Sequence, residues 1–458
     1  MGDGRVVAEG QGVEGEGATY RAYRRRFAMA VTVMLLNVCN AGLCFNLASV
    51  AYKAADYFEA TLPQINWFSE VYLVVPFMFF LVSTFTFNKF GVKAGIHLGS
   101  ALNCVGALTR ALATSGLINK ASTQYAVSLT GQVAAAIGST YLAFISTKVA
   151  QNWFPDEERM MATTAVTFSP ALGISVAQVV SPLLVPETQQ LPTLNYAYAG
   201  LAVLCELVAV VCVTRSRPPT PPSRSAEQGE AKRAPFLQQL KDTLTCLPFL
   251  GMLLMTAIIV ATFLSFSTLT QQILCSMGYS DLFSGATVTT FVIAGLVGSL
   301  TIAVVAIRTK ALTPIVKFSY AFGVVCAVVM MEMYLVPDQS VLLLIAASLF
   351  GFFCNGVFAL SLEMGVETTY PVEETISATL MYVTGQVLGV LMTNAVVYFS
   401  SDLPRSLEGV EVCTAGLTSN LEARDYSAPI TGVMVVLSVI VILFVPLFHT
   451  PYKRQQAG

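Results

Sequence analysis

The most unusual chemical groups in this sequence are carboxylates that lie within or beside long apolar stretches. Placing a charged side chain at the centre of a membrane-spanning helix costs about 3 kcal/mol or more. Such residues are therefore expected to attract a cation, carry a proton or hold a gate. The sequence has five of them: Glu70, Glu206, Glu332, Glu363 and Glu367.

The stretches that must position these groups have the length of membrane-spanning helices. Hydrophobic residues make up 55% of the chain and charged residues only 11%. A bilayer core about 30 Å thick needs roughly 20 apolar residues per helix, and lipid offers no partner for unpaired backbone groups. We therefore predict an all-α membrane protein with twelve spans: 27–50, 67–87, 94–114, 124–147, 160–184, 193–214, 248–272, 283–306, 311–334, 340–362, 374–399 and 427–448.

The basic residues predict the orientation of these spans. If the N-terminus is cytoplasmic, the outer loops hold only five of the 25 Lys and Arg residues: Lys53, Arg110, Lys120, Arg405 and Arg424. Because cytoplasmic loops carry an excess of Lys and Arg, both termini are predicted to be cytoplasmic. The first apolar stretch has no cleavage signal after it, so we interpret it as an uncleaved helix.

A Pro-rich and charged segment at 215–247 separates two groups of six spans. Its composition is typical of a flexible, solvated linker. The predicted organisation is a cytoplasmic tail at 1–26, a six-helix bundle at 27–214, the linker at 215–247, a second six-helix bundle at 248–448 and a cytoplasmic tail at 449–458.

Five short motifs carry a resemblance to a known family. They are Gln64–Tyr72, Asn152–Pro155, Gln271–Cys275, Thr384–Gly389 and His449–Arg454. Over about residues 24–454 the chain resembles the feline leukaemia virus subgroup C receptor-related transporters, solute carrier family 49, and one branch of it most closely. This family lies within the major facilitator superfamily. The resemblance implies two six-helix bundles that rock about a midplane site and a small organic solute that is choline- or ethanolamine-like, vitamin-like or heme-like.

The family's choline carriers hold a quaternary ammonium between aromatic rings by cation–π attraction, and this sequence departs from that site. The first-span family motif continues to Gln and Trp, where the chain has Leu43 and Cys44. The seventh-span Tyr falls on Leu264, and the fourth-span Gln falls on Ser139. Only the eleventh-span Gln is kept, as Gln386.

The solute site is therefore expected around Gln386, with either a different substrate or a rearranged aromatic site that uses Phe45 and Phe263. Small polar residues on spans also form hydrogen bonds between helices, and that alternative stays open for each candidate. The other polar candidates are Asn40, Ser139, Ser265 and Thr268.

Several residues are candidates for gating or coupling. Glu70, about one turn into its span, would attract a cation, carry a proton or face water at a cavity mouth. Glu363 and Glu367 share one helix face and are expected to contact basic cytoplasmic loops. Asn88 stands where the superfamily has an Asp in the loop after span 2. Because only Glu206 approaches mid-span depth, transport is expected to be uncoupled, and a proton-coupled exporter is the alternative.

The ten cysteines divide by compartment. Cys275 and Cys413 are predicted to lie on the outer side, where an oxidising environment permits a disulfide. The other eight lie in spans or near the cytoplasmic face and should behave as small apolar residues.

The sequence contains no phosphate-binding loop, no His-Glu-x-x-His and no nucleophile elbow between strand and helix. We therefore expect no enzyme activity, no cofactor, no metal site and no nucleic-acid partner. We interpret the chain as a secondary transporter in the lipid bilayer, monomeric and located in the plasma membrane rather than the lysosome. The alternative interpretation is a receptor or scaffold of the same fold that has lost transport.

Overall fold

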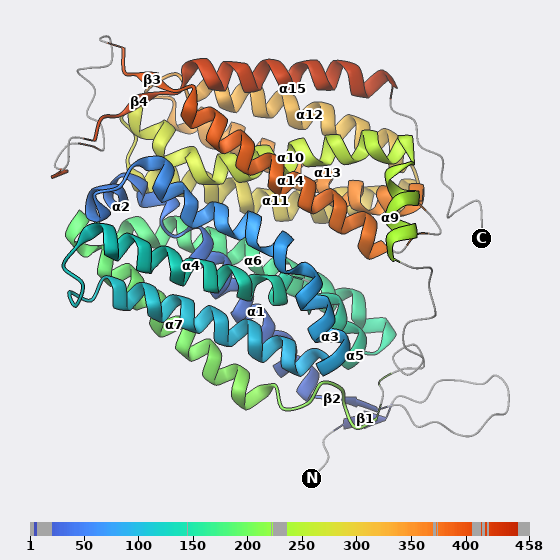
Figure 1. The fold of residues 1–458 in the computed structure, drawn as a ribbon. Coiled ribbons are helices and arrows are strands. Elements are labelled where there is room, and N and C mark those ends of the chain that lie inside the picture. Colours follow the sequence, from blue (N-terminus) through green and yellow to red (C-terminus); the bar gives the residue numbers. More distant parts are fainter. Residues whose placement is uncertain are drawn as a thin grey trace, which may run out of the picture. The chain divides into compact units, whose positions relative to one another are not determined.

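The structure, a computed structural model, is almost entirely helical (Figure 1). It describes residues 4–6, 21–143, 145–220, 222, 236–369, 372, 374–404, 414, 417–418 and 421–447. The α-helices are α1 (Arg25–Phe45), α2 (Ala51–Phe58), α3 (Leu62–Ala113), α4 (Ala121–Ala143), α5 (Ile145–Trp153), α6 (Asp156–Leu184), α7 (Leu191–Cys212), α9 (Phe236–Leu244), α10 (Leu247–Ser276), α11 (Asp281–Thr309), α12 (Leu312–Met333), α13 (Ser340–Thr369), α14 (Glu374–Tyr398) and α15 (Ser427–Leu447).

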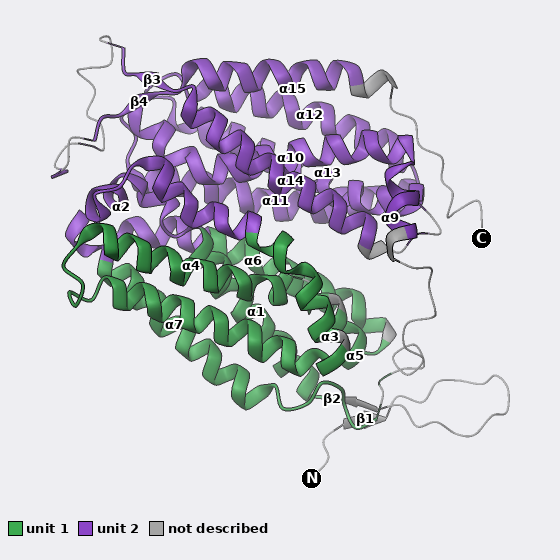
Figure 2. Ribbon diagram, in the orientation of Figure 1, with its two compact units in different colours: residues 1–44, 75–174, 192–232 green, residues 45–74, 175–191, 233–458 purple. Residues whose placement is uncertain are grey.

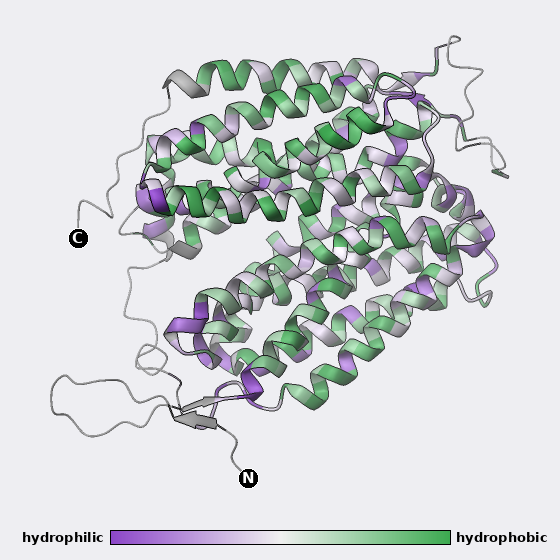
Figure 3. Ribbon diagram, turned by 180° about the vertical axis from the view of Figure 1, so that it is seen from behind, coloured by the Kyte–Doolittle hydropathy of each residue, from purple (hydrophilic) through white to green (hydrophobic). Residues whose placement is uncertain are grey.

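The predicted spans coincide with these helices. Nine helical segments of the described chain are long and apolar enough to cross a membrane. The other three predicted spans correspond to the second part of α3, to α4 and to α15, whose apolar segments are more polar or shorter. Hydrophobic residues run along the helices, and hydrophilic residues gather near the helix ends (Figure 3). This distribution is what a bilayer core flanked by water requires.

One long helix joins two spans across a kink, and the first span is interrupted. The long helix α3 contains Gly91 with φ 79° and ψ 176°, where two helices meet at a kink. Glycine adopts this conformation without the steric cost that a side chain would add. The first span is divided into α1, the short 3₁₀ helix η1 (Ala48–Val50) and α2. The turn after α1 releases backbone carbonyls that a continuous helix would have bonded.

The remaining elements are short. A second 3₁₀ helix, η2, covers Thr188–Gln190. Strand β1 (Gly4–Val6) pairs antiparallel with β2 (Arg21–Tyr23), and β3 (Ser401–Asp402) pairs antiparallel with β4 (Arg424–Asp425). The β3–β4 pair flanks the loop between the last two spans.

The chain divides into two compact units (Figure 2). Unit 1 comprises residues 1–44, 75–174 and 192–232, and unit 2 comprises residues 45–74, 175–191 and 233–458. Unit 2 thus combines α10–α15 with α2, the first turns of α3 and the end of α6. Each of the two predicted six-helix bundles is one continuous stretch of the sequence, whereas each compact unit combines three separate stretches. The boundaries of the bundles stay a prediction.

Close helix packing in unit 2 depends on glycine. A methyl group added at Gly298 of α11 would stand 1.9 Å from the carbonyl oxygen of Phe352, and one at Gly351 of α13 would stand 2.0 Å from that of Phe291. Small residues of this kind let membrane helices approach until their backbones touch. Phe266, Phe291 and Phe350 pack beside this contact with ring centroids 5.0–6.4 Å apart.

Candidate functional site

The predicted substrate-binding residues fall in both compact units. Unit 1 holds Asn40, Cys44 and Ser139, and unit 2 holds Phe45, Phe263, Leu264, Thr268 and Gln386. Each group is therefore described within its own unit.

In unit 1 the polar candidates have partners inside the helix bundle. The Asn40 amide donates to Asn103 Oδ1 at 2.9 Å and to the carbonyl oxygen of Ala135 at 3.1 Å. Ser139 donates to the carbonyl oxygen of Ala136 in its own helix at 2.7 Å. Cys44 is buried. The contacts of Asn40 and Ser139 therefore agree with the alternative role of small polar residues in spans, which is hydrogen bonding within and between helices.

A buried arginine next to these residues was missed by sequence reasoning. Arg110 was assigned to an outer loop, but it lies inside α3 with only 1% of its surface exposed. Its guanidinium donates to Gln132 Oε1 at 2.7 Å and to Asn195 Oδ1 at 3.0 Å. The prediction of the orientation assumed that every Lys and Arg lies in water, and this assumption is wrong for Arg110. The signal that could have found Arg110 is the apolar run on both sides of it.

Arg110 also reaches the interruption of the first span. Its Nη1 donates to the carbonyl oxygen of Leu43 at 3.3 Å, and Gln132 Nε2 donates to the same oxygen at 2.9 Å. Leu43 lies in the last turn of α1, where the helix stops and its carbonyls need other donors. Discontinuous helices stabilised in this way commonly line the solute sites of transporters. Arg110 and Gln132 thus support the backbone on which Asn40 and Cys44 lie.

In unit 2 the Gln386 side chain is buried, with 5% of its surface exposed. Within the described part of the chain, its amide has no hydrogen-bond partner. The amide is not one of the fully buried unpartnered groups of the described residues, so it keeps some accessible surface at which a ligand or a water molecule can bind.

The other unit 2 candidates are mainly packing residues. Thr268 donates to the carbonyl oxygen of Leu264 at 2.9 Å within α10. The Phe263 ring stacks on Phe291, with centroids 5.3 Å apart and planes at 23°. Phe45 is buried. Phe263 and Phe45 therefore remain the aromatic candidates of this unit.

Glu70 does not face water. Only 1% of its surface is exposed, and its Oε1 accepts from Asn394 Nδ2 of α14 at 2.9 Å. Its second oxygen, Oε2, is buried and has no partner within the described residues. Asn394 also lines a cavity of about 860 Å³, together with Thr61, Tyr398, Asp402 and others. Glu70 therefore connects the second span to the wall of this cavity.

The remaining gating candidates lie near helix ends. Glu367 is buried and Glu363 is exposed, both in the last turns of α13. The side chain of Asn88 lies outside the described residues.

Cys275 is disulfide-bonded, and the other eight described cysteines are free thiols. The predicted partner, Cys413, lies outside the described residues, so the pairing stays a prediction.

Peptide mapping under non-reducing conditions is expected to recover Cys275 and Cys413 in one linked pair, because both are predicted to face an oxidising compartment. Finding both as free thiols would contradict this pairing.

The sequence model of the Major Facilitator Superfamily matches residues 33–393. The chain belongs to this superfamily. Like the superfamily's other members it is a multi-pass membrane transporter of the solute carrier kind and not an enzyme.

Relatives within the superfamily agree with the resemblance inferred from the motifs. The chain is 27% identical to solute carrier family 49 member A3 of Xenopus tropicalis, over 99% of this chain and 92% of that protein. It is 28% identical to the Danio rerio protein of the same name, over 96% and 90%. It is 25% identical to the human choline/ethanolamine transporter FLVCR2, over 81% of this chain and 71% of that protein. The predicted resemblance to solute carrier family 49 is confirmed.

Solved structures of superfamily members share the fold. A D-xylose–proton symporter matches with a TM-score of 0.64 and 12% identity, over 93% of this chain and 98% of that protein. A bacterial homologue of the human lysosomal transporter Spinster matches with a TM-score of 0.64 and 10% identity, over 93% and 97%. The predicted superfamily fold is confirmed.

Proposed function

We propose that this superfamily member carries a small organic solute by alternating access, driven by the solute's own gradient. The observation that carries the proposal is Gln386, whose side chain is only 5% exposed and whose amide has no hydrogen-bond partner in the described chain. Transporter sites are mostly apolar with a few placed polar groups, and Gln386 has this character. The interrupted first span supports the same function, since broken helices are typical of midplane solute sites.

The relatives narrow the class of solute. FLVCR2 is described as a choline/ethanolamine transporter, and the family resemblance also implies vitamin-like or heme-like solutes. We propose that the solute of this chain belongs to one of these three classes. Leu264 and Cys44 stand at family cage positions and have no ring for cation–π attraction. Phe263 and Phe45 are the aromatic residues that would replace them, and each ring contributes about 0.5–2 kcal/mol to binding a desolvated cation.

The arrangement of the chain in the cell belongs to the same proposal. The two six-helix bundles are joined by the linker at 215–247, both termini are cytoplasmic, and the carrier is a monomer in the plasma membrane. The Arg residues before α1 support this orientation, because basic residues are retained on the cytoplasmic side.

The test is solute flux in proteoliposomes across a panel of radiolabelled amines, vitamins and porphyrins. Gln386→Ala is expected to reduce the flux of the transported solute about five- to tenfold, since a lost hydrogen bond costs about 1–1.5 kcal/mol. Gln190→Ala, which changes an exposed glutamine, is the matched control and should leave flux unchanged.

Two outcomes favour the alternatives. Absence of flux across the panel favours a receptor or scaffold of the same fold, which the missing cage aromatics keep open. Flux that requires a pH gradient favours a proton-coupled exporter, for which the buried Glu70 is the supporting observation.

A further inference from the structure

The segment that follows α7 combines arginine and proline at a regular spacing. Residues 215–221 have the sequence Arg-Ser-Arg-Pro-Pro-Thr-Pro, in which Arg215, Pro218 and Pro221 are three positions apart. In a polyproline II helix, which has three residues per turn, these three residues form one edge, which we call the Arg–Pro edge. Pro-x-x-Pro segments of this kind dock into the aromatic-lined grooves of SH3 domains. The sequence therefore has the pattern of an SH3 ligand, and the structure describes it as far as Thr220.

The backbone of this segment is not part of a helix or a sheet. Helix α7 ends at Cys212, and residues 213–220 belong to neither a helix nor a strand. Within the described chain, residues 215–220 form no hydrogen bond between backbone groups. A polyproline II helix likewise has no internal hydrogen bonds and keeps its backbone in water. The segment can therefore adopt this conformation without breaking a helix or a strand pair.

Both arginines of the segment are available to a partner. Arg215 and Arg217 are exposed, and neither guanidinium has a hydrogen-bond or ion-pair partner among the described residues. Arg26, in the same unit, differs from them because its Nε lies 2.9 Å from Glu158 Oε2. An unpaired guanidinium can form two parallel hydrogen bonds with a carboxylate of another protein. Arg215 is therefore placed to pair with a carboxylate beside the groove.

Ser216 attaches the segment to unit 1 through a different edge. Its Oγ accepts a hydrogen bond from the backbone N–H of Lys93 at 3.1 Å. Lys93 follows the kink at Gly91, after which a new helix begins and its first N–H groups need acceptors. In polyproline II geometry Ser216 shares its edge with Pro219. A ridge with three edges enters a groove with two of them, so the Ser216 edge can remain on α3 while the Arg–Pro edge binds.

Thr220 belongs to the third edge, together with Arg217. The Thr220 hydroxyl is hydrogen-bonded to the Tyr23 hydroxyl, and the two oxygens are 2.9 Å apart. A domain that binds the Arg–Pro edge and this third edge must break that hydrogen bond. Tyr23 therefore competes with the partner for Thr220.

The chain also contains the reverse pattern, Pro219-x-x-Pro222-x-Arg224. This register would place Pro219 and Pro222 in the groove. However, Pro222 is buried, and Pro219 shares its edge with Ser216, which is bonded to α3. The structure therefore favours the register of the Arg–Pro edge.

We propose that residues 215–220, with the Pro221 that follows them, are the docking site of a cytoplasmic SH3 domain. Pro218 enters the aromatic groove, and Arg215 pairs with a carboxylate of the domain. The segment lies on the predicted cytoplasmic side, where such a domain can reach it. This interaction goes beyond the proposed carrier function and is separate from it, since it uses no residue of the solute site.

The test uses the full chain in nanodiscs of phosphatidylcholine, whose headgroups carry no net charge. The protein is titrated against an array of purified SH3 domains. We expect at least one domain to bind, and Pro218→Ala and Arg215→Gln should each weaken that binding about tenfold or more, because each removes an anchor of the interface. Pro219→Ala is the matched control. It removes a proline from the edge bonded to α3 and should change the affinity less than about twofold.

Tyr23→Phe should tighten binding about two- to fivefold, because the competing hydrogen bond is lost. Absence of binding to every domain of the array would overturn the proposal. So would binding that Pro219→Ala abolishes and Arg215→Gln leaves unchanged, since that result assigns the reverse register. Binding that survives Pro218→Ala and disappears at high salt would show attraction between charges only, and it would equally exclude the docking site.

Discussion

Arg110→Ala is expected to lower the free energy of unfolding by about 3–4 kcal/mol. The substitution removes a buried guanidinium that donates to Leu43, Gln132 and Asn195. Hydrogen bonds to charged groups are worth about 1.5–3 kcal/mol, and acceptors left unsatisfied in the interior add to the loss. The interrupted end of α1 would lose one of its two described donors, so the first span should become less ordered.

Thermal unfolding in detergent, followed by tryptophan fluorescence, measures this loss. Arg308→Ala is the control. It removes the same charge, but from an exposed side chain near the end of α11. If Arg110→Ala lost less than about 1 kcal/mol, the guanidinium would not be what supports the end of α1.

Gly285→Ala is expected to push α11 away from the end of α6 within unit 2 and to lower solute flux. A methyl group at this position of α11 would stand 1.9 Å from the carbonyl oxygen of Gln178 in α6. A backbone oxygen cannot move to another rotamer, so the two helices must separate. The gain in helix propensity from Gly to Ala, about 1 kcal/mol, further stabilises α11 itself. We expect at least a tenfold loss of solute flux, measured in proteoliposomes.

Gly351→Ala is the matched comparison. Its methyl group would meet the carbonyl oxygen of Phe291 at 2.0 Å, between α13 and α11. Both of these helices follow the linker and pack side by side in unit 2, so the overlap must be relieved between α11 and α13. This variant should lose about 1–3 kcal/mol of stability or more, with flux unchanged in the folded fraction. Equal loss of flux in the folded fractions of the two glycine variants would contradict a specific role of the α6–α11 contact in transport.

The positions of the helices along the chain were predictable because lipid forces apolar stretches into helices. The residues at which the helices begin and end were less predictable. The second span was predicted to begin at 67, but α3 begins at Leu62. Thr61 and Gln64 form a capping box, in which the Thr61 backbone N–H donates to Gln64 Oε1 at 2.8 Å. The spacing Thr-x-x-Gln was visible in the sequence, but the hydropathy pattern outweighed it.

The site was predictable only where a residue has a family counterpart, as Gln386 has. Lys53 and Arg110 were assigned to outer loops, because a charge in a sequence is expected to lie in water. Their partners, Asp281 for one and Gln132 and Asn195 for the other, are 22 to 228 positions away. Whether a cation is buried depends on such distant acceptors, and no local pattern contains that information.

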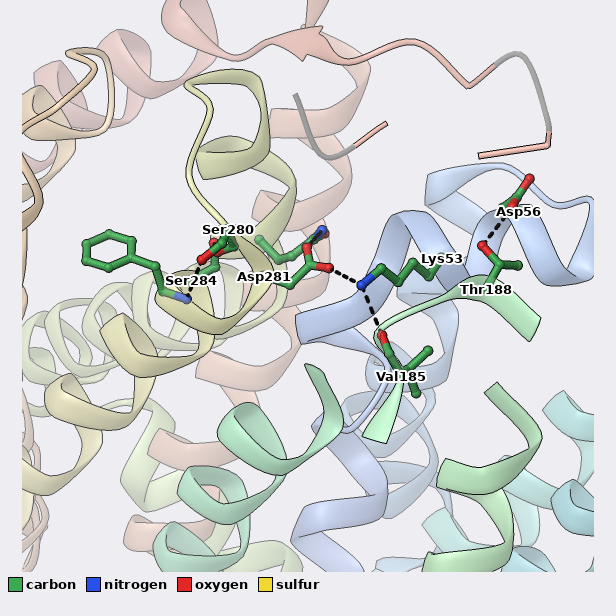
Figure 4. Close-up of polar contacts among 9 residues, drawn as sticks. Lys53, Asp56, Val185, Thr188, Ser280, Asp281 and Ser284 are labelled. Atoms are coloured by element: carbon green, nitrogen blue, oxygen red, sulfur yellow. Dashed lines mark hydrogen bonds and ion pairs between the residues drawn. The ribbon is translucent and has the colours of Figure 1, made fainter. Parts of the chain in front are cut away.

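The composition of unit 2 has a consequence for biosynthesis. Residues 45–74 and 175–191 leave the ribosome before α10–α15 have been made, yet they belong to the same compact unit as those helices. The Lys53 ammonium and the Asp56 carboxylate must therefore enter the membrane before Asp281 and Thr418 exist. During that interval Val185 and Thr188 can serve as their first acceptor and donor once the fifth span is inserted. These partners (Figure 4) would thus satisfy the two charged groups until the second half of the chain has been made.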